Sequence, residues 1–154
     1  MFGNVYSPRI RQPRSGRETF ILPAKPALLA PTSRGAIIIV QPNFESEREL
    51  CETLRGAGYE VEVIQEDKLE RVSSDDVEIV LLFVSGSEVQ TYGICSTIKH
   101  KRATLPIIVI GPDDASTKLR FFSLGANDYV LGSFDRLELL ARIKSQIRRH
   151  RANL

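Results

Sequence analysis

The sequence predicts an α/β fold in which one parallel sheet is covered by helices on both faces. Three observations support this: short β-branched runs recur, each is followed by apolar residues at helical spacing, and turn or capping residues separate the two. Regular alternation of strand and helix produces parallel strands joined by right-handed crossovers. With 154 residues, of which 42% are hydrophobic, the chain can bury one such core.

The first part of the sheet is predicted from residues 36–64. Ala36–Val40 is almost entirely β-branched, which indicates a strand buried on both faces. Asn43 is a suitable N-cap for a helix from Phe44 to about residue 55, where glycines end it. Residues 59–64 largely alternate between acidic and apolar side chains, so we expect a strand with one exposed face at the edge of the sheet.

The middle of the chain contains the most apolar run. Residues 66–76 are rich in acidic side chains and predict a short, irregular helix. Glu78–Val84 follows and is the predicted central strand. After a turn, residues 89–100 have the spacing of a helix, and residues 106–110 form a fourth buried strand before a Gly-Pro break.

The last two predicted helices flank a short strand. Asp113 or Asp114 caps a helix that ends near residue 124, and Asp128–Leu131 forms the fifth strand. Asp135 caps a final helix that ends near residue 150. Its predicted buried stripe consists of Leu137, Leu140, Ile143 and Ile147. The five strands fit a flavodoxin-like sheet of order 2-1-3-4-5, in which ligands bind at the carboxyl ends of the strands.

The domain organisation follows from changes in composition. Residues 1–34 predict a flexible, basic arm, because five prolines fall among arginines without a steady hydrophobic period. Apolar residues between Phe20 and Leu29 can still attach part of the arm to a surface groove. Residues 35–150 form the predicted domain, and residues 151–154 are expected to be a tail or the stub of a linker.

The net charge of +2 hides an uneven distribution. Residues 1–34 hold six basic residues and one acidic residue, a net charge of +5, and residues 136–154 hold the same numbers. Between them, residues 35–135 have nine basic and seventeen acidic residues, a net charge of −8. This argues against a uniformly basic nucleic-acid-binding domain. We expect nucleic-acid contact only through the basic ends or through an output domain missing from this sequence.

Residue types exclude several classes of protein. Cys51 and Cys95 are isolated in apolar stretches, so we expect buried thiols and neither disulfides nor a zinc site. No apolar run approaches the roughly 20 residues of a membrane helix. We therefore expect a cytoplasmic protein with no membrane partner.

Little reactive chemistry follows the predicted strands at their carboxyl ends. His, Cys and Lys are absent from these loops, and helix capping explains Asp113 and Asp114. The pattern offers no nucleophile with a nearby base, no metal cluster and no phosphate-binding glycine motif. We therefore expect no enzymatic activity, no cofactor and no metal site.

Several stretches are similar to a known family. They are Glu78–Val84, Leu105–Gly111, the segment Leu124-Gly-Ala-Asn-Asp-Tyr-Val130, and Leu137-Glu-Leu-Leu-Ala-Arg-Ile143 after Phe134. Together they resemble the receiver domain of bacterial two-component response regulators, over about residues 35–150. The resemblance implies a signalling protein with the flavodoxin-like, receiver-like fold.

The resemblance also implies a phosphorylation site that this chain has lost. In the family, an Asp at the end of the third strand accepts the phosphoryl group, and here that position is Phe83. The acidic pair that helps to hold Mg²⁺ falls on Gln41 and Pro42, the hydroxyl residue on Gly111, and the lysine on Gly132. Phosphoryl transfer of this kind needs carboxylates, a divalent ion and a further cation. The chain is therefore identified as a degenerate member, a phosphorylation-independent pseudo-receiver.

Part of the family's switch and of one interface is retained. The switch aromatic is present as Tyr129, although its hydroxyl partner is absent. In the receiver subfamily joined to winged-helix DNA-binding domains, the fourth helix, fifth strand and fifth helix form a symmetric dimer interface with paired charges. The matching positions are Lys118 with Glu138, Asp128 with Arg142, and Arg149, whose acidic partner is replaced by Asn127. The alternative explanation is that these residues are ordinary solvated charges on amphipathic helices.

These observations predict a signalling module that acts through protein–protein interaction. We expect a homodimer through that helix–strand–helix face, a signalling protein as partner, or both, with the domain as the regulatory part of a larger response regulator. The alternative is a sensor of a small, nucleotide-like anion in the cleft at the strand ends. There the Ser85-Gly86-Ser87 turn offers backbone N–H groups.

Overall fold

The computed structural model describes residues 35–41 and 47–153, so the predicted arm, Pro42, the cap Asn43 and Phe44 lie outside the described residues. The five strands pair in the order β2-β1-β3-β4-β5, and all four pairings are parallel. The α/β class, the strand order and the central strand are confirmed. Along the chain the elements are β1 (Ala36–Val40), α1 (Glu47–Gly56), β2 (Glu60–Ile64), the 3₁₀ helix η2 (Glu66–Ser73), β3 (Val77–Phe83), α2 (Glu88–Lys101), β4 (Ile107–Gly111), α3 (Ala115–Ser123), β5 (Asp128–Leu131) and α4 (Arg136–Ala152).

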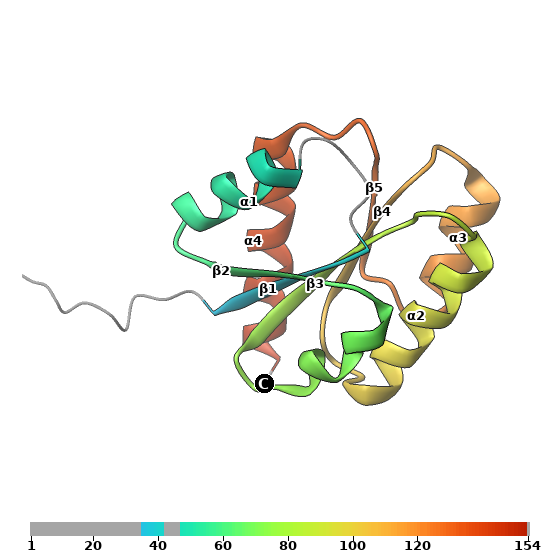
Figure 1. Cartoon of the computed structure of the whole chain (residues 1–154), viewed down its shortest axis with the longest axis horizontal. Helices are drawn as coiled ribbons and strands as arrows, with labels where there is room; N and C mark the ends of the chain where they lie inside the picture. The colour runs from blue at the N-terminus through green and yellow to red at the C-terminus, as the bar shows by residue number, and fades with distance from the viewer. Residues whose placement is uncertain (1–34, 42–46, 154) are drawn as a thin grey trace, which may run out of the picture. The chain divides into compact units, whose positions relative to one another are not determined.

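Two layers of helices cover the sheet, with α1 and α4 on one face and α2 and α3 on the other (Figure 1). Successive side chains of a strand point to opposite faces, so each buried strand contributes to both apolar layers. In β1, Ile37 and Ile39 pack in the layer of α1 and α4, whereas Ile38 and Val40 pack in the layer of η2, α2 and α3. All of β1 is buried, as its β-branched run predicts.

Aspartate side chains begin two of the helices. Asp114 accepts a hydrogen bond from the backbone N–H of Thr117 at 2.8 Å. Asp135 accepts hydrogen bonds from the backbone N–H groups of Leu137 and Glu138 at 2.8 and 3.0 Å. N–H groups in the first turn have no partner within the helix, and such a cap stabilises by about 1 kcal/mol. Asp114, the second of the two predicted candidates, is the cap of α3.

The final helix differs from the prediction in two respects. It runs to Ala152, so Arg151 belongs to α4 and not to a tail, and its guanidinium pairs with Glu78 at 3.0 Å. Leu137 does not belong to the buried stripe: it is 71% exposed, and Leu139 is buried instead. Each helical residue advances by about 100°, so two positions turn a side chain to nearly the opposite side. The buried apolar stripe is Leu139, Ile143 and Ile147.

Two expectations from residue types can be compared with the structure. Cys51 and Cys95 are buried free thiols, as predicted. Burial raises the pKa of both, and that of Cys95 reaches about 11, so both act as packing residues. Within residues 35–41 and 47–153, none of the helices is both long and apolar enough to span a membrane.

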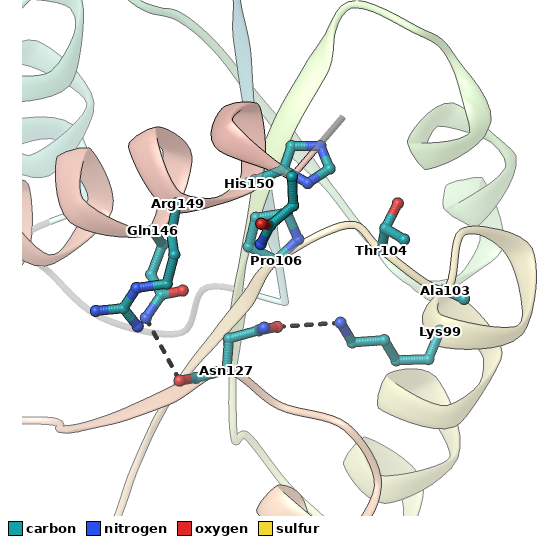
Figure 2. Close-up of a pocket in the computed structure, with 9 residues that line it drawn as sticks. Lys99, Ala103, Thr104, Pro106, Asn127, Gln146, Arg149 and His150 are labelled. Carbon is teal, nitrogen blue, oxygen red and sulfur yellow. Dashed lines mark hydrogen bonds between the residues drawn. The ribbon is translucent and has the colours of Figure 1, made fainter.

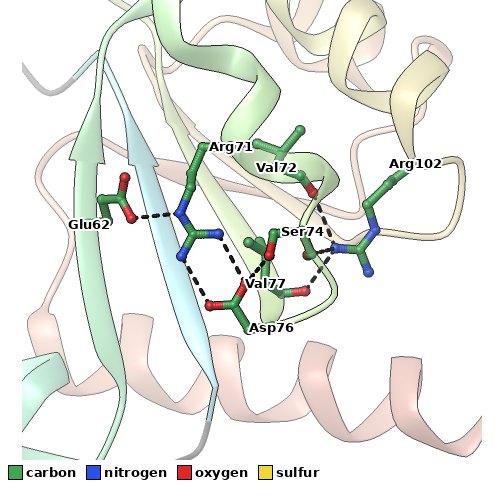
Figure 3. A network of polar contacts seen from close by, with 7 residues as sticks. All are labelled: Glu62, Arg71, Val72, Ser74, Asp76, Val77 and Arg102. Atoms are coloured by element: carbon green, nitrogen blue, oxygen red, sulfur yellow. Dashed lines mark hydrogen bonds and ion pairs between the residues drawn. The ribbon is translucent and has the colours of Figure 1, made fainter.

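Two arginines fix the segment between η2 and the central strand (Figure 3). Arg71 donates to both carboxylate oxygens of Asp76 at 3.0 Å and to Glu62 of β2 at 2.7 Å. Hydrogen bonds from Arg71, and then from Ser74, lower the pKa of the Asp76 carboxyl to about 2. Arg102, which follows α2, donates from Nη1 at 2.9–3.2 Å to the backbone carbonyl oxygens of Val72, Ser74 and Val77.

Candidate functional site

A hollow of about 680 Å³ lies at the carboxyl ends of β3, β4 and β5. Carboxyl ends of parallel strands meet at one edge of the sheet, which is where this fold binds ligands. Phe83, Gly111 and Gly132 all line the hollow. The structure therefore brings together three of the positions at which the receiver resemblance places the phosphorylation machinery. Gln41 follows β1 at the same edge.

Phe83 places an aromatic ring at the position where the receiver resemblance puts the phosphoacceptor. It is the last residue of β3 and is 7% exposed. Its ring packs edge-on against Phe134, with the ring centres 6.4 Å apart and the planes at 62°. It also belongs to the apolar layer under α1 and α4. A packed hydrocarbon ring supplies neither a nucleophilic oxygen nor a metal ligand.

Gln41, at a position where the resemblance places an acid, is buried and has an unusual backbone conformation. Its φ is 56°, in the left-handed region that residues other than glycine rarely adopt. Its backbone N–H donates to the Ile64 carbonyl at 3.1 Å. Its side-chain Oε1 is buried and accepts no hydrogen bond from the described residues. A neutral amide supplies no negative charge to offset a divalent cation.

Tyr129 points inward, toward the end of β4. The residue is 9% exposed, and its hydroxyl donates to the Pro112 carbonyl at 2.7 Å. A Cβ atom on Gly111 would lie 2.6 Å from the Tyr129 hydroxyl oxygen and 2.8 Å from a methyl carbon of Val84. Burial, followed by the nearby charge of Glu88, raises the pKa of Tyr129 to about 12. The missing side chain at Gly111 therefore leaves the space that the tyrosine occupies.

The charges around the hollow do not suit an anion. Glu88 and Asp113 are among its lining residues, and none of the described residues that line it is a lysine or an arginine. In the adjoining turn, the Ser87 hydroxyl is engaged as the N-cap of α2, where it accepts from the Gln90 N–H at 3.4 Å. The alternative of a nucleotide-like anion in this cleft gains no support from these contacts.

The predicted interface charges form contacts within one chain. Arg142 donates to Asp128 at 3.0 and 3.2 Å and to Glu138 at 3.1 and 3.3 Å. The hydrogen bond to Asp128, and then that to Glu138, raises the pKa of Arg142. Lys118 pairs with Asp113 at 3.2 Å, and its Nζ lies 5.9 Å from the centre of the Tyr129 ring. The pair of Asp128 with Arg142 is thus formed intramolecularly, and that of Lys118 with Glu138 is not.

Two exposed apolar residues of α3 were missed by the sequence analysis. Leu119 is 70% exposed and Phe122 is 44% exposed, and they lie three positions apart, which places them on neighbouring parts of one helix surface. The buried residues of this helix are Thr117 and Phe121, four positions apart. Ala115, Leu119 and Phe122 have the spacing of one apolar stripe, so the sequence offers two candidate stripes, and packing on the sheet buries the one with Thr117 and Phe121.

Asn127 is directed toward α2 rather than toward an acidic interface. Its Oδ1 accepts hydrogen bonds from Lys99 Nζ at 3.0 Å and from the Ile107 N–H at 2.9 Å. Arg149 forms no ion pair with any residue that the structure describes. Among the described residues, the third charged pair of the predicted interface is therefore not formed.

The fold and the site together define a class of protein. A five-stranded parallel sheet in this order, with an aromatic of β5 directed at the end of β4, fits the receiver-like class that the sequence resemblance implies. The strand-end hollow lies where such domains carry their site.

Comparisons with known proteins lead to the same class. The chain is 30% identical over 115 residues to the response regulator ArlR of Staphylococcus saprophyticus, covering 73% of this chain and 52% of that protein. It is 27% identical over 118 residues to the transcriptional regulatory protein HprR of Escherichia coli K12, covering 75% of this chain and 53% of that protein. The chain thus spans about half the length of the curated relatives it matches. No family model matches it.

Solved structures agree with this result. A putative response regulator from Chloroflexus aurantiacus superposes with a TM-score of 0.66 at 28% identity, covering 74% of this chain and 98% of that one. A CheY-like receiver domain protein from Methanospirillum hungatei has a TM-score of 0.70 at 17% identity, covering 78% and 98%, and shows the shared fold. The chain belongs to the response-regulator receiver domain family.

Proposed function

We propose that this chain is a pseudo-receiver, a receiver domain that signals by binding proteins without being phosphorylated. The observation that carries the proposal is Phe83, packed against Phe134 at the end of β3. Covalent transfer of a phosphoryl group requires a nucleophilic atom on the acceptor residue, and this ring has none. The domain is a binding module and not an enzyme.

The residues around Phe83 support the same conclusion. Gly111 and Gly132 line the hollow without a hydroxyl or an ammonium group. The carboxylates of Glu88 and Asp113 are the charged groups among the described lining residues. A phosphoryl group is itself anionic and is stabilised by cations and hydrogen-bond donors. The described lining of this hollow therefore offers no lysine or arginine to stabilise a phosphoryl group.

The inward Tyr129 supports a single conformation of the switch. In the buried position, its hydroxyl donates to Pro112 and its ring packs 6.2 Å from that of Phe121. Turning outward would break the hydrogen bond and expose the ring. In the family, a hydroxyl residue at this position links phosphorylation to the aromatic residue. Gly111 has no hydroxyl, so Tyr129 has no such link to a phosphorylation site.

The partner surface that we propose is formed by α3, β5 and α4, and its first partner is a second copy of the chain. Leu119 and Phe122 provide exposed apolar area on α3, and charged residues from all three elements accompany them. Isologous dimers bury such mixed patches, with an apolar centre and a polar rim. On dimerisation, Lys118 would leave Asp113 of its own chain and pair with Glu138 of the second copy. Arg142 would likewise leave Asp128 of its own chain and pair with Asp128 of the second copy.

A larger assembly is part of the proposal. HprR is named a transcriptional regulatory protein, and this chain matches 53% of its length. We infer that the domain is the regulatory part of a larger response regulator, in which a further domain makes the main contact with nucleic acid.

Exposure to a phosphodonor tests the proposal directly. The purified chain is incubated with acetyl phosphate and Mg²⁺, and its intact mass is measured beside a receiver domain with a complete aspartate site. We expect the mass of this chain to stay unchanged. Its melting temperature is also expected to be insensitive to Mg²⁺ and to beryllofluoride, because Gln41, Pro42 and Phe83 stand where the family has the repelling carboxylates that a metal relieves. A phosphorylated species, or a shift of several degrees, would overturn the proposal.

A further inference from the structure

A second hollow, of about 240 Å³, lies at the opposite edge of the sheet from the strand-end site. It is formed by the last turns of α2 and α4 and by the segments that lead into β4 and β5, as Figure 2 shows. Its described lining includes three basic side chains and no acidic one. The basic residues are Lys99, Arg149 and His150, and the polar ones include Thr104, Asn127 and Gln146.

Lys99 carries a positive charge that no carboxylate of the described residues offsets. Its ammonium donates to the Leu105 carbonyl at 2.7 Å and to Asn127 Oδ1 at 3.0 Å, and both acceptors are neutral. An ammonium has three donors, so one remains for a further acceptor. The side chain is half-buried, and burial lowers the pKa of Lys99. Such a charge is stabilised by an anion that enters the hollow.

Asn127 is the reason that this charge is uncompensated. The receiver resemblance places an acid here, and an acid in hydrogen-bond contact with Lys99 would form an ion pair. The amide keeps both hydrogen bonds, to Lys99 and to the Ile107 N–H, without the negative charge. Its own backbone carbonyl is held by Gln146 Nε2 at 3.4 Å, which fixes α4 to the same wall. The hollow is therefore preorganised and cationic.

The neighbouring basic residues of α4 differ in whether they are neutralised. Arg142 pairs with Asp128 and Glu138, and Arg151 pairs with Glu78. Arg149 and His150 have no carboxylate partner in the part of the chain that the structure describes. The carboxyl ends of α2 and α4 each contribute roughly half a negative elementary charge. The two positive charges of Lys99 and Arg149 together exceed the negative charge of the two helix ends.

We propose that this hollow binds a phosphate group, carried by inorganic phosphate or by a small phosphate monoester. A tetrahedral anion accepts hydrogen bonds in several directions at once, as an ammonium, a guanidinium and the Thr104 hydroxyl can supply them. A water molecule occupies about 30 Å³, so the hollow has room for a phosphate group with some of its water. The site lies apart from the strand-end hollow and does not rest on the proposed function.

Nuclear magnetic resonance titration of the full chain tests this inference. Inorganic phosphate is one arm and glycerol 3-phosphate is the other, with the ionic strength held constant by sodium chloride so that general screening does not change. We expect saturable shifts of the Asn127 side-chain amide and of the Thr104 and Gln146 backbone amides. Stronger binding of the monoester would identify an ester as the ligand, and equal binding would identify the phosphate group alone.

Variants of single residues separate a site from general basicity. Asn127→Asp retains acceptors for Lys99 and for the Ile107 N–H but offsets the positive charge of Lys99, so the fold should be kept while phosphate affinity falls about tenfold or more. Arg149→Gln should weaken binding similarly. Arg148→Gln removes the same charge one residue earlier on α4, outside the lining, and should bind like the wild type.

The inference is overturned if phosphate produces no saturable shifts in the folded wild type. It is equally overturned if Arg148→Gln weakens binding as much as Arg149→Gln, since the effect would then be one of overall charge. Persistence of full affinity in folded Asn127→Asp would have the same consequence.

Discussion

The Tyr129 hydroxyl lies in the space that a side chain on Gly111 would fill. A Cβ atom on the glycine would lie 2.6 Å from the hydroxyl oxygen. The hydroxyl donates a hydrogen bond at 2.7 Å to the carbonyl of Pro112, the residue that follows Gly111. Real Cβ atoms do not approach an oxygen so closely. A larger residue at position 111 would therefore displace the Tyr129 side chain. The absence of a side chain at Gly111 lets Tyr129 lie in this position.

The first prediction concerns this contact. Gly111→Ala should lower the free energy of unfolding by about 1–3 kcal/mol, because the added methyl group overpacks the space beside Tyr129 and Val84. Urea unfolding measures the loss. Gly132→Ala is the matched control, since a Cβ there would meet nothing closer than 4.0 Å. Adding Tyr129→Phe to Gly111→Ala should cost less than the sum of the single changes, because the phenylalanine removes the closest clashing atom. Full additivity, or an unchanged stability of Gly111→Ala, would contradict this account.

The second prediction concerns self-association. Arg142→Glu places an acid beside Asp128 and Glu138 and should convert a dimer to a monomer, as light scattering at high protein concentration can show. Leu119→Ser should weaken the dimer while leaving the ion pairs intact. Lys144→Glu reverses a charge elsewhere on α4 and serves as the control. Circular dichroism checks that each variant is folded. A wild-type chain that stays monomeric at high concentration would exclude the proposed interface.

The third prediction concerns the hydrogen bonds by which Arg102, at the end of α2, holds η2 and the segment after it. Arg102→Met keeps the apolar stem of the side chain but removes the guanidinium from three backbone carbonyls. The carbonyls of Val72 and Val77 are partly buried at these contacts, so we expect a loss of about 2 kcal/mol or more in the free energy of unfolding. Lys101→Met removes an exposed charge one position earlier and should change stability little. Equal effects of the two substitutions in urea would refute a specific role for Arg102.

The fourth prediction concerns acid stability. The folded-state pKa of Asp76 lies near 2, below its ordinary value of 3.8, because Arg71 and Ser74 hydrogen-bond to the carboxylate. A depressed pKa contributes stability above the unfolded value, and this is lost as the pH falls from about 4 toward 2. Asp76→Asn should therefore show a smaller loss of stability over that interval. Asp75→Asn, at an exposed neighbour, should follow the wild-type curve, and thermal melts at several pH values compare all three.

Local patterns explain why much of the fold could be predicted. The β-branched run of β1, the alternation in β2 and the caps Asp114 and Asp135 each depend on residues close together in the chain. Leu137 shows the limit of this reasoning. It has the helical spacing of a buried residue, but packing of α4 on the sheet selects the stripe through Leu139, and the spacing alone does not specify which of two nearby stripes is buried.

The candidate site divides in the same way. The chemistry of Phe83 is a property of one residue, so its inability to accept a phosphoryl group follows from the sequence and the resemblance alone. The position of Tyr129 depends on Gly111, which is eighteen positions earlier and on the neighbouring strand. The exposure of Leu119 and Phe122 depends on how α3 is rotated against the sheet. These relations arise only when elements pack together.

By itself, the sequence determined the alternation of strands and helices, the order of the sheet that this alternation predicts, and the residue types at the positions where the resemblance places the phosphorylation site. Tertiary structure alone decided that Tyr129 lies inward over Gly111, that Arg102 at the end of α2 binds three carbonyls in η2 and in the segment after it, and that Lys99, Asn127 and Arg149 surround one cationic hollow. The physical reason is the range of the interactions. Helices and strands are visible in the sequence as local periodicity of apolar residues. The room for a side chain, its burial and whether its charge is paired depend on which distant residues the folded chain brings together.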